Sequence, residues 1–483
     1  MYNVKSKNPS SFINHEEILA TIAYANENKR NATLIDFIIE KAKKGQGLSH
    51  REAAVLLACA IPEKNQEILK LAKRIKEKFY GKRIVMFAPL YLSNYCINGC
   101  VYCPFNCKNK EISRKKLTQE EIRNEVIALQ DVGHKRLALE AGEDPIHNTM
   151  EYILESINTI YNIKHKNGAI RRVNVNIAAT TVENYKLLKE ADIGTYILFQ
   201  ETYHKENYEK LHPSGPKHNY DYHTEAMDRA MEAGIDDVGL GVLFGLNNYE
   251  YDFVGLLMHG EHLEAVYGVG PHTISVPRLC EANNINPNDF NKVISDEIFE
   301  KIVACLRIAV PYTGIIVSTR ERRESRERAL EFGASQLSGG SKTSVGGYTK
   351  VAETNGHLKS EELDLEKTKQ FDTSDNRTLD EIVHWLIKLG YIPSFCTACY
   401  KEGRTGDRFM TLCKTGQIHN CCLPNSLMTL KEYAIDYATS ETKLSADALI
   451  EREILNIPNE KTREIVRNNL KLIESDNHRY FRF

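Results

Sequence analysis

Eight short runs rich in β-branched residues, each followed by an amphipathic helical stretch, occupy the middle of this 483-residue chain. The runs lie near residues 84–90, 136–141, 172–178, 195–201, 237–244, 272–278, 314–319 and 334–338. Strands that alternate with helices pair in parallel, so eight such units predict an α/β fold closed into a (β/α)8 TIM barrel. A doubly wound open sheet uses the same alternation and is the alternative.

Capping signals and helical periodicity mark the helices between these strands. Thr118 with Glu121, and Thr180 with Glu183, each place a hydroxyl three residues before a carboxylate, which is the pattern of a capping box. Apolar residues at helical spacing predict further helices over 149–165, 222–233, 251–266 and 295–310.

The segments on either side of the barrel differ from it in pattern. The N-terminal segment reads as a helical leader, with Ser49 and Glu52 as a capping box. After residue 345 the chain becomes polar and irregular, a helix is expected over 379–389, and residues 391–425 are expected to be rich in loops. Helical patterns return over 427–440 and 446–476. We therefore expect a helical N-terminal extension over 1–80, a barrel over 81–345 and a mainly helical, cluster-binding C-terminal domain over 346–483.

Bulk composition argues against several classes of partner. The chain has 63 basic and 65 acidic side chains, which gives a formal net charge of −2 and no basic surface for nucleic acid. Its longest apolar run, Ala53 to Ile61, is far shorter than the ~20 residues of a membrane span, and the N-terminus lacks the apolar core of a secretory signal. A cytoplasmic protein that binds neither nucleic acid nor membrane is expected.

Three cysteines follow the first predicted strand directly. Cys96, Cys100 and Cys103 have three and then two residues between them, and Gly99 allows their loop to wrap closely. Loops at the C-terminal ends of barrel strands build the active site. Three thiolates can hold a 4Fe-4S cluster and leave one iron open to another ligand. A zinc loop with Cys107 as fourth ligand, or a set of buried thiols, is the alternative.

This cysteine spacing resembles the defining motif of the radical S-adenosylmethionine (SAM) superfamily. The resemblance implies that SAM chelates the open iron and that reduction of the cluster cleaves SAM to methionine and a carbon radical. It also implies SAM contacts at the ends of later strands, and Ala141 departs from the glycine usual at its position. The implied SAM-binding residues are Tyr102, Ala141, Gly142, Glu143 and Glu201.

A second cysteine set lies near the C-terminus. Cys396 and Cys399 are separated by two residues, and Cys422 follows after 22 more. A zinc site or a four-cysteine cluster that includes Cys413 or Cys421 is an alternative on spacing alone. With the first set, this spacing resembles the HydG family of radical SAM tyrosine lyases, and the resemblance covers nearly the whole chain. It implies an auxiliary 4Fe-4S cluster on Cys396, Cys399 and Cys422.

The HydG resemblance extends to three further residues at predicted strand ends. His272 is implied to bind an additional iron beside the auxiliary cluster, bridged by a free L-cysteine. Arg320 offers a planar fork for the carboxylate of an amino-acid substrate, unless it only forms a surface ion pair. Ser338 opens a loop of glycines and hydroxyls at the same rim and is predicted as a further substrate contact, with a phosphate site or a hinge leading out of the barrel as the alternatives.

The resemblance implies a radical SAM lyase that cleaves tyrosine at Cα–Cβ to p-cresol and dehydroglycine. Carbon monoxide and cyanide then form on iron for assembly of the FeFe-hydrogenase H-cluster. A thiazole-synthase-type tyrosine lyase, another radical SAM enzyme and an iron-sulfur scaffold with two clusters are the alternatives. Implied partners are a ferredoxin or flavodoxin as electron donor and other hydrogenase maturation proteins. We also expect an internal passage between the two barrel ends, and expect Cys59, Cys280 and Cys305 to be small buried apolar residues.

Overall fold

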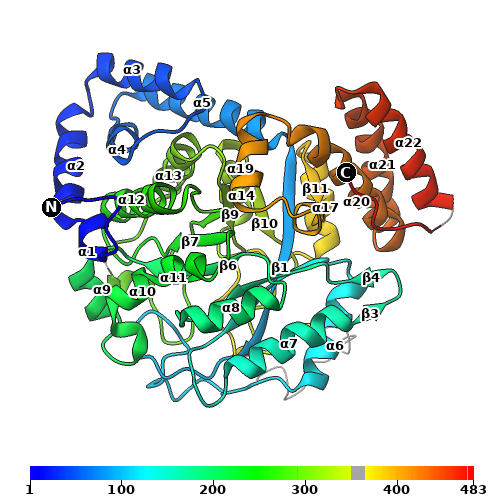
Figure 1. The fold of residues 1–483 in the computed structure, drawn as a ribbon, viewed down its shortest axis with the longest axis horizontal. Helices are drawn as coiled ribbons and strands as arrows, with labels where there is room; N and C mark the ends of the chain where they lie inside the picture. Colours follow the sequence, from blue (N-terminus) through cyan, green and yellow to red (C-terminus); the bar gives the residue numbers. More distant parts are fainter. Residues whose placement is uncertain (291, 350–364, 476) are drawn as a thin grey trace.

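A closed parallel barrel forms the centre of the computed structural model, which describes residues 1–290, 292–349, 365–475 and 477–483 (Figure 1). Neighbouring strands pair in parallel, and the last pairs with the first through Val85 and Gln336. The predicted barrel is confirmed, and the open-sheet alternative is wrong. In barrel order the strands are β1 (Arg83–Ser93), β2 (Arg136–Ala141), β5 (Arg172–Asn176), β6 (Tyr196–Glu201), β7 (Val238–Val242), β8 (Thr273–Ser275), β9 (Gly314–Val317) and β10 (Gln336–Ser338).

Helices surround the strands, and the structure corrects two details of their prediction. The capping box of Thr118 and Glu121 forms as expected. The helix after β5 instead begins one residue later than expected, because the side chain of Thr181, not Thr180, accepts the bond from the Asn184 amide. The helix expected over 222–233 is divided at Glu225. These helices are α6 (Gln119–Asp131), α7 (Met150–Asn162), α8 (Val182–Glu190), α9 (Lys205–Leu211), α10 (Tyr220–Thr224), α11 (Ala226–Glu232), α12 (Tyr249–Tyr267), α13 (Asp296–Ala309) and α14 (Arg323–Phe332).

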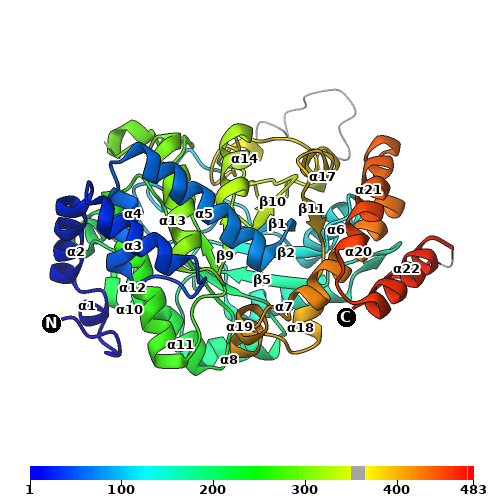
Figure 2. The ribbon, with the colours of Figure 1, turned by 90° about the horizontal axis from the view of Figure 1, so that it is seen from above.

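Five helices precede the barrel and pack on its outer layer through α12 and α13 (Figure 2). The capping box of Ser49 and Glu52 is present. The ring of His50 contacts Glu261 of α12 at 2.7 Å, which ties this leader to the barrel. The five are α1 (Pro9–Phe12), α2 (His15–Asn28), α3 (Ala32–Ala42), α4 (His50–Ala58) and α5 (Pro62–Tyr80).

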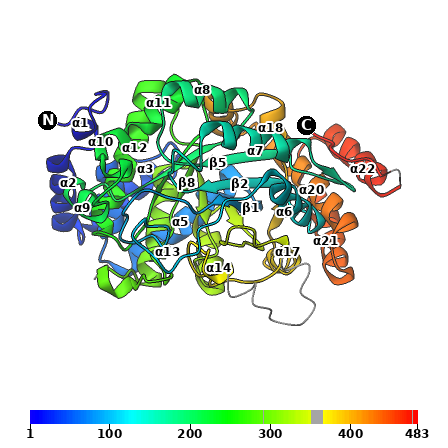
Figure 3. The ribbon, with the colours of Figure 1, turned by 90° about the horizontal axis from the view of Figure 1, so that it is seen from below.

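The C-terminal segment lies at the opposite end of the long dimension from α1 and α2 (Figures 1 and 3). A short strand within it adds to β1 in parallel, with Arg83 opposite Ile392. The prediction that residues 391–425 are rich in loops is wrong, because three helices begin there. The polar crossing predicted after residue 345 falls largely on residues 350–364, outside the described residues. The elements are α17 (Leu379–Lys388), β11 (Ile392–Ser394), α18 (Ala398–Lys401), α19 (Gly406–Lys414), α20 (His419–Asp436), α21 (Ser440–Glu453) and α22 (Glu460–Ser475).

A separate two-stranded hairpin, β3 (Lys164–His165) with β4 (Gly168–Ala169), links α7 to β5. Of the helices in the described part of the chain, none combines the length and apolarity needed to cross a bilayer.

Candidate radical SAM site and second cysteine site

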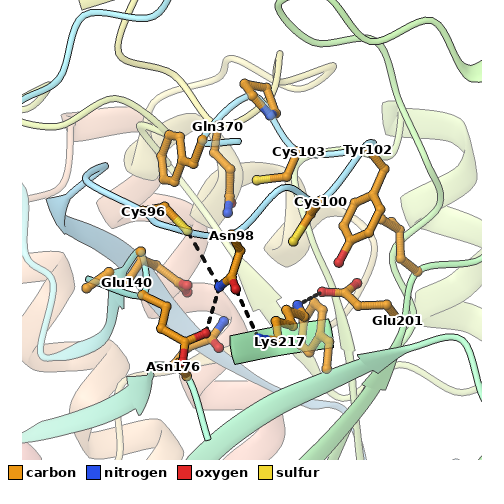
Figure 4. A pocket seen from close by; sticks show the side chains of 18 of the residues that line it. Cys96, Asn98, Cys100, Tyr102, Cys103, Glu140, Asn176, Glu201, Lys217 and Gln370 are labelled. Atoms are coloured by element: carbon orange, nitrogen blue, oxygen red, sulfur yellow. Dashed lines mark hydrogen bonds and ion pairs between the residues drawn. The ribbon is translucent and has the colours of Figure 1, made fainter. Parts of the chain in front are cut away.

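A large cavity opens at the C-terminal ends of the barrel strands and encloses about 1090 Å³ of free space, including its mouth. The three early cysteines line it, and Figure 4 shows their sulfur atoms directed toward the same space. The structure therefore brings the first cysteine set and every predicted SAM contact to one site. The predicted contacts that line it are Tyr102, Ala141, Gly142, Glu143 and Glu201.

The cysteine loop is held in place by close backbone contacts. The amide of Gly99 donates to the carbonyl of Ser214 at 2.9 Å, and a Cβ at Gly99 would lie 2.4 Å from the Ser214 hydroxyl. At the end of β2, a Cβ at Gly142 would lie 2.3 Å from the carbonyl oxygen of Tyr95. A side chain at either glycine would therefore displace the loop that carries the thiols.

The three thiols are free, and their surroundings favour the neutral form. Burial raises the pKa of Cys103 to about 11 and also raises the pKa values of Cys96 and Cys100. A buried thiol ionises when a metal centre takes the thiolate as a ligand. The alternative fourth ligand, Cys107, is exposed and is absent from the cavity lining.

A polar network links the cysteine loop to the predicted SAM contacts. The Asn98 amide nitrogen donates to Glu143 at 2.6 Å, and its amide oxygen accepts from the backbone of Lys217 at 3.0 Å. The Lys217 ammonium pairs with Glu201 at 2.8 Å. Burial alone would lower the pKa of Lys217, but Glu201 and Cys100 raise it above its ordinary value. Sequence reasoning missed both Asn98 and Lys217, because no spacing pattern marks them.

The aromatic ring of Tyr102, one of the predicted SAM contacts, is fixed by a histidine. The hydroxyl of Tyr102 lies 2.7 Å from Nε2 of His212, and both side chains are buried. Burial lowers the pKa of His212 to about 2, so this imidazole is neutral. The contact fixes the direction of the tyrosine ring beside the cysteines.

A second, mainly apolar cavity lies deeper in the barrel and shares part of its lining with the first, including Glu140 and Arg320. The guanidinium of Arg320 lies 3.6 Å from the centroid of the Phe371 ring and 3.4 Å from the Cys280 sulfur. Arg320 is therefore at the cavities and not in a surface ion pair. Ser338 lines only the inner cavity. The apolar side chains in the wall of the inner cavity include Phe87, Pro89, Ala138, Ile197, Phe199, Pro277 and Ile316.

Three other cysteines, Cys59, Cys280 and Cys305, were predicted to be small buried apolar residues. Cys59 and Cys305 are buried, as expected. Cys280 is not fully buried, and the prediction for it is wrong. It lines the outer cavity, where its sulfur lies 3.4 Å from the guanidinium of Arg320.

The second cysteine set gathers at the N-terminal end of the barrel. The Arg83 guanidinium, at the start of β1, donates to the Cys422 sulfur at 2.6 Å. Hydrogen bonding to Cys422 and burial raise the pKa of the Cys399 thiol. The sulfur of Cys396 accepts from the amide of Ala398 at 3.4 Å. The guanidinium of Arg83 is thus a buried cation beside the three cysteines, which come from α18, from α20 and from the turn before α18.

The two neighbouring cysteines belong to an apolar cluster beside this set. Cys413 and Cys421 are buried with Phe409, Met410 and Ile418. The Cys421 thiol donates to the carbonyl of Ile418 at 3.3 Å. Both cysteines are therefore part of the apolar packing next to the second set.

His272 lies at the same barrel end, just before β8. Its Nδ1 is 3.5 Å from Asp237, and its ring centroid is 5.0 Å from that of Phe409. Arg172 covers the ring of Tyr400 at 4.1 Å, and Arg136 donates to the backbone carbonyl of Cys396 at 3.0 Å. Arginines therefore begin β1, β2 and β5 around this site, a feature that sequence reasoning missed.

Comparison with solved structures identifies the family of the chain. A crystal structure of HydG, described as a maturase of the [FeFe]-hydrogenase, is 52% identical, with 98% of this chain and 100% of that chain covered and a TM-score of 0.92. The chain belongs to the HydG family of radical SAM enzymes. A second family member, HydG from Carboxydothermus hydrogenoformans, is 40% identical over 96% of this chain and 99% of that one, with a TM-score of 0.81.

Sequence comparisons agree with placement in the HydG family. The Radical SAM superfamily profile matches residues 90–257, and the Biotin and Thiamin Synthesis associated domain matches residues 275–392. The 2-iminoacetate synthase of Salmonella typhimurium is 30% identical over 64% of this chain and 80% of its own length. The chain is thus a radical SAM lyase, and its family implies a 4Fe-4S cluster, SAM, a small-molecule substrate and an electron donor.

Proposed function

We propose that this HydG-family enzyme cleaves tyrosine at Cα–Cβ to p-cresol and dehydroglycine and converts the dehydroglycine into carbon monoxide and cyanide on iron. The product would serve assembly of the FeFe-hydrogenase H-cluster. One observation carries the proposal: two sets of three cysteines lie at opposite ends of one closed barrel, with an inner cavity next to the first set.

The residues around the outer cavity fit the cofactors of the first half-reaction. Cys96, Cys100 and Cys103 would hold a 4Fe-4S cluster, which when reduced supplies the electron that cleaves SAM to methionine and the 5'-deoxyadenosyl radical. Glu143 and Glu201 would accept hydrogen bonds from the methionine amine and the ribose hydroxyls. Enclosure by the barrel excludes water from the reacting groups.

The inner cavity fits an aromatic amino acid. Its apolar wall would surround the phenol ring, while the guanidinium of Arg320 would bind the carboxylate through two parallel hydrogen bonds. Ser338 would be a further polar contact on the same wall. Because Arg320 also lines the outer cavity, it would hold the substrate next to the SAM site.

The residues at the other barrel end fit a second cluster. Cys396, Cys399 and Cys422 would hold an auxiliary 4Fe-4S cluster, and a buried guanidinium beside them offsets the charge of thiolate ligands. His272 would bind an additional iron carrying a free L-cysteine, since imidazole is a common ligand for iron. A ferredoxin or flavodoxin would supply electrons, and other hydrogenase maturation proteins would accept the product.

A thiazole-synthase-type tyrosine lyase is the second candidate, because the chain is 30% identical to a 2-iminoacetate synthase. Such an enzyme would share the first cysteine set and the carboxylate clamp. The second cysteine set, with its buried arginines, favours the HydG-type reaction.

Anaerobic reconstitution tests the proposal. The protein is supplied with iron and sulfide, its two clusters are counted by metal analysis and electron paramagnetic resonance, and SAM, dithionite and tyrosine are added. We expect 5'-deoxyadenosine, p-cresol, carbon monoxide and cyanide. Deoxyadenosine without p-cresol would reject tyrosine as substrate, and p-cresol without carbon monoxide would favour the thiazole-type lyase.

A further inference from the structure

Two side chains of opposite charge, Glu140 and Arg320, line the inner cavity. Glu140 is on β2, and Arg320 follows β9, which lies across the barrel with β1 and β10 between. Both residues also line the outer cavity, so they sit where the two spaces meet. Among the described residues that line the inner cavity, only Tyr91, Glu140 and Arg320 carry titratable groups.

Neither Glu140 nor Arg320 has an oppositely charged partner among the described side chains. Within the described ranges, Glu140 and Arg320 form no ion pair within 4 Å, with each other or with another side chain. Arg320 instead contacts the ring of Phe371 and the sulfur of Cys280. An unpaired charge away from bulk water is costly unless a ligand completes it.

The neighbours of Glu140 fix its position without forming an ion pair with it. Tyr91, Glu140 and Asn176 lie opposite one another on β1, β2 and β5, so their side chains form one row on the barrel wall. The Tyr91 hydroxyl donates to Gln370 at 2.7 Å, and a hydrogen bond from Asn176 favours the ionised form of Glu140. The row leaves a carboxylate directed at the cavity opposite a guanidinium.

We propose that Glu140 binds the α-ammonium group of the amino-acid substrate while Arg320 binds its carboxylate, so that the inner cavity selects zwitterions. The two unpaired, opposite charges of the cavity match the two charges of a free α-amino acid. This inference rests on the proposed function and deepens it, because it names the residue that distinguishes tyrosine from a phenolic acid without an amine.

Binding should then depend on pH in a defined direction. Burial raises the pKa of Glu140 to about 8, while Arg320 and Asn176 act to lower it. Glu140 is therefore mostly neutral at pH 6.5, and its charge, with the attraction for ammonium, increases as the pH rises through 8. Apart from the cysteines, the other charged or titratable groups facing this region are Tyr91, Tyr102, Glu143, Glu201, Lys217, His223 and Arg320.

Burial also raises the pKa of Glu143, so the loss of the pH dependence in Glu140→Gln assigns it to Glu140. Three of the other groups do not mimic the change expected of Glu140. The pKa of Tyr91 lies well above its ordinary value because of burial. Burial lowers the pKa of His223 to about 3, so it stays neutral. Lys217 is held charged by its pair with Glu201.

The test compares two probes on the reconstituted enzyme with SAM and without reductant, by equilibrium dialysis at pH 8. The probes are L-tyrosine and 3-(4-hydroxyphenyl)propanoate, which lacks only the amino group. We expect tyrosine to bind about 10- to 100-fold more tightly in the unaltered enzyme, the range of a charged hydrogen bond. In Glu140→Gln this preference should fall to about 3-fold or less.

Two further variants separate this role from general damage. Arg320→Gln should weaken the binding of both probes equally and leave the ratio of their affinities unchanged, because both probes carry the carboxylate. Glu155→Gln neutralises an exposed carboxylate of α7 and should change neither of the two affinities. A Glu140→Gln enzyme that keeps the full preference for tyrosine would overturn the inference.

The pH dependence of the unaltered enzyme gives a test that needs no variant. The ratio of the two affinities should rise about 10-fold between pH 6.5 and pH 8.5, and a flat ratio would overturn the inference even if Glu140→Gln did not fold. If the unaltered enzyme forms p-cresol but its preference is insensitive to Glu140, only this inference fails. If it neither binds tyrosine nor forms p-cresol, the proposed function fails and this inference with it.

Discussion

The two cysteine sets differ in how the chain assembles them and in the charges around them. The first comes from one short loop after β1 and is surrounded by Glu143 and by the pair of Glu201 with Lys217. The second is drawn from residues 396–422 and lies against arginines from three strand beginnings. Carboxylates suit a cationic sulfonium and an ammonium group, whereas buried arginines suit an anionic assembly of thiolates and sulfide. One barrel thus offers opposite electrostatic surroundings at its two ends.

The largest effect is expected at the first set. Cys100→Ala should lower both 5'-deoxyadenosine and p-cresol formation by about 1000-fold or more, because three thiolates are needed to hold the cluster with one open iron. Product analysis by liquid chromatography measures both. Cys107→Ala is the matched control, since Cys107 is exposed. Full activity in Cys100→Ala would contradict the assignment of SAM cleavage to the first cysteine set.

The double variant Cys396→Ala, Cys399→Ala should separate the two half-reactions. We expect p-cresol formation to stay within about 3-fold of the unaltered enzyme, while carbon monoxide falls about 100-fold. Carbon monoxide is measured by its capture on a haem protein. Parallel loss of p-cresol would show that the two ends do not divide the work.

Arg83→Met should change the electronic character of the second cluster alone. Loss of a charged hydrogen bond of about 2 kcal/mol corresponds to a reduction potential lower by about 80 mV, since the added electron loses a neighbouring cation. Redox titration followed by electron paramagnetic resonance measures both clusters in one sample. The exposed Arg452→Met serves as control. An equal shift in the first cluster would contradict a local role of Arg83.

Lys217→Met should give the smallest effect. It leaves Glu201 buried without its cationic partner, so the carboxylate loses the contact that holds it in position beside the SAM site. We expect SAM to bind about 3- to 10-fold more weakly in equilibrium dialysis. The exposed Lys205→Met, which breaks a surface pair with Asp221, should leave SAM affinity unchanged. An unaltered affinity in Lys217→Met would show that this pair is purely structural.

Local patterns in the sequence predicted most of the barrel. All eight strands lie within two residues of their expected starts, because buried parallel strands are continuous apolar runs. The capping boxes at Ser49 and Thr118 also form, since they depend on residues three apart. Thr180 failed as a cap because the adjacent Thr181 offers the same hydroxyl one residue later.

Contacts between distant segments could not be predicted in this way. The contact of Arg83 with Cys422 joins residues 339 positions apart, and an arginine at a strand start has no distinguishing pattern. Lys217 and Glu140 likewise acquire their surroundings only when the barrel closes. The short helices α18 and α19 were missed because the turns around them contain glycine and threonine, which favour loops on local grounds.

The length of β1 fixes how far a reaction product must move. Its 11 residues run from Arg83, beside the second cysteine set, to Ser93, just before the first. At about 3.3 Å per residue this is a separation on the order of 33 Å, and a hydrogen-bonded strand cannot shorten. Under the proposed function, a fragment released at one end would diffuse that distance. The delay between the first and last products should then increase with bulky substitutions in the barrel interior, whereas faster chemistry should leave it unchanged.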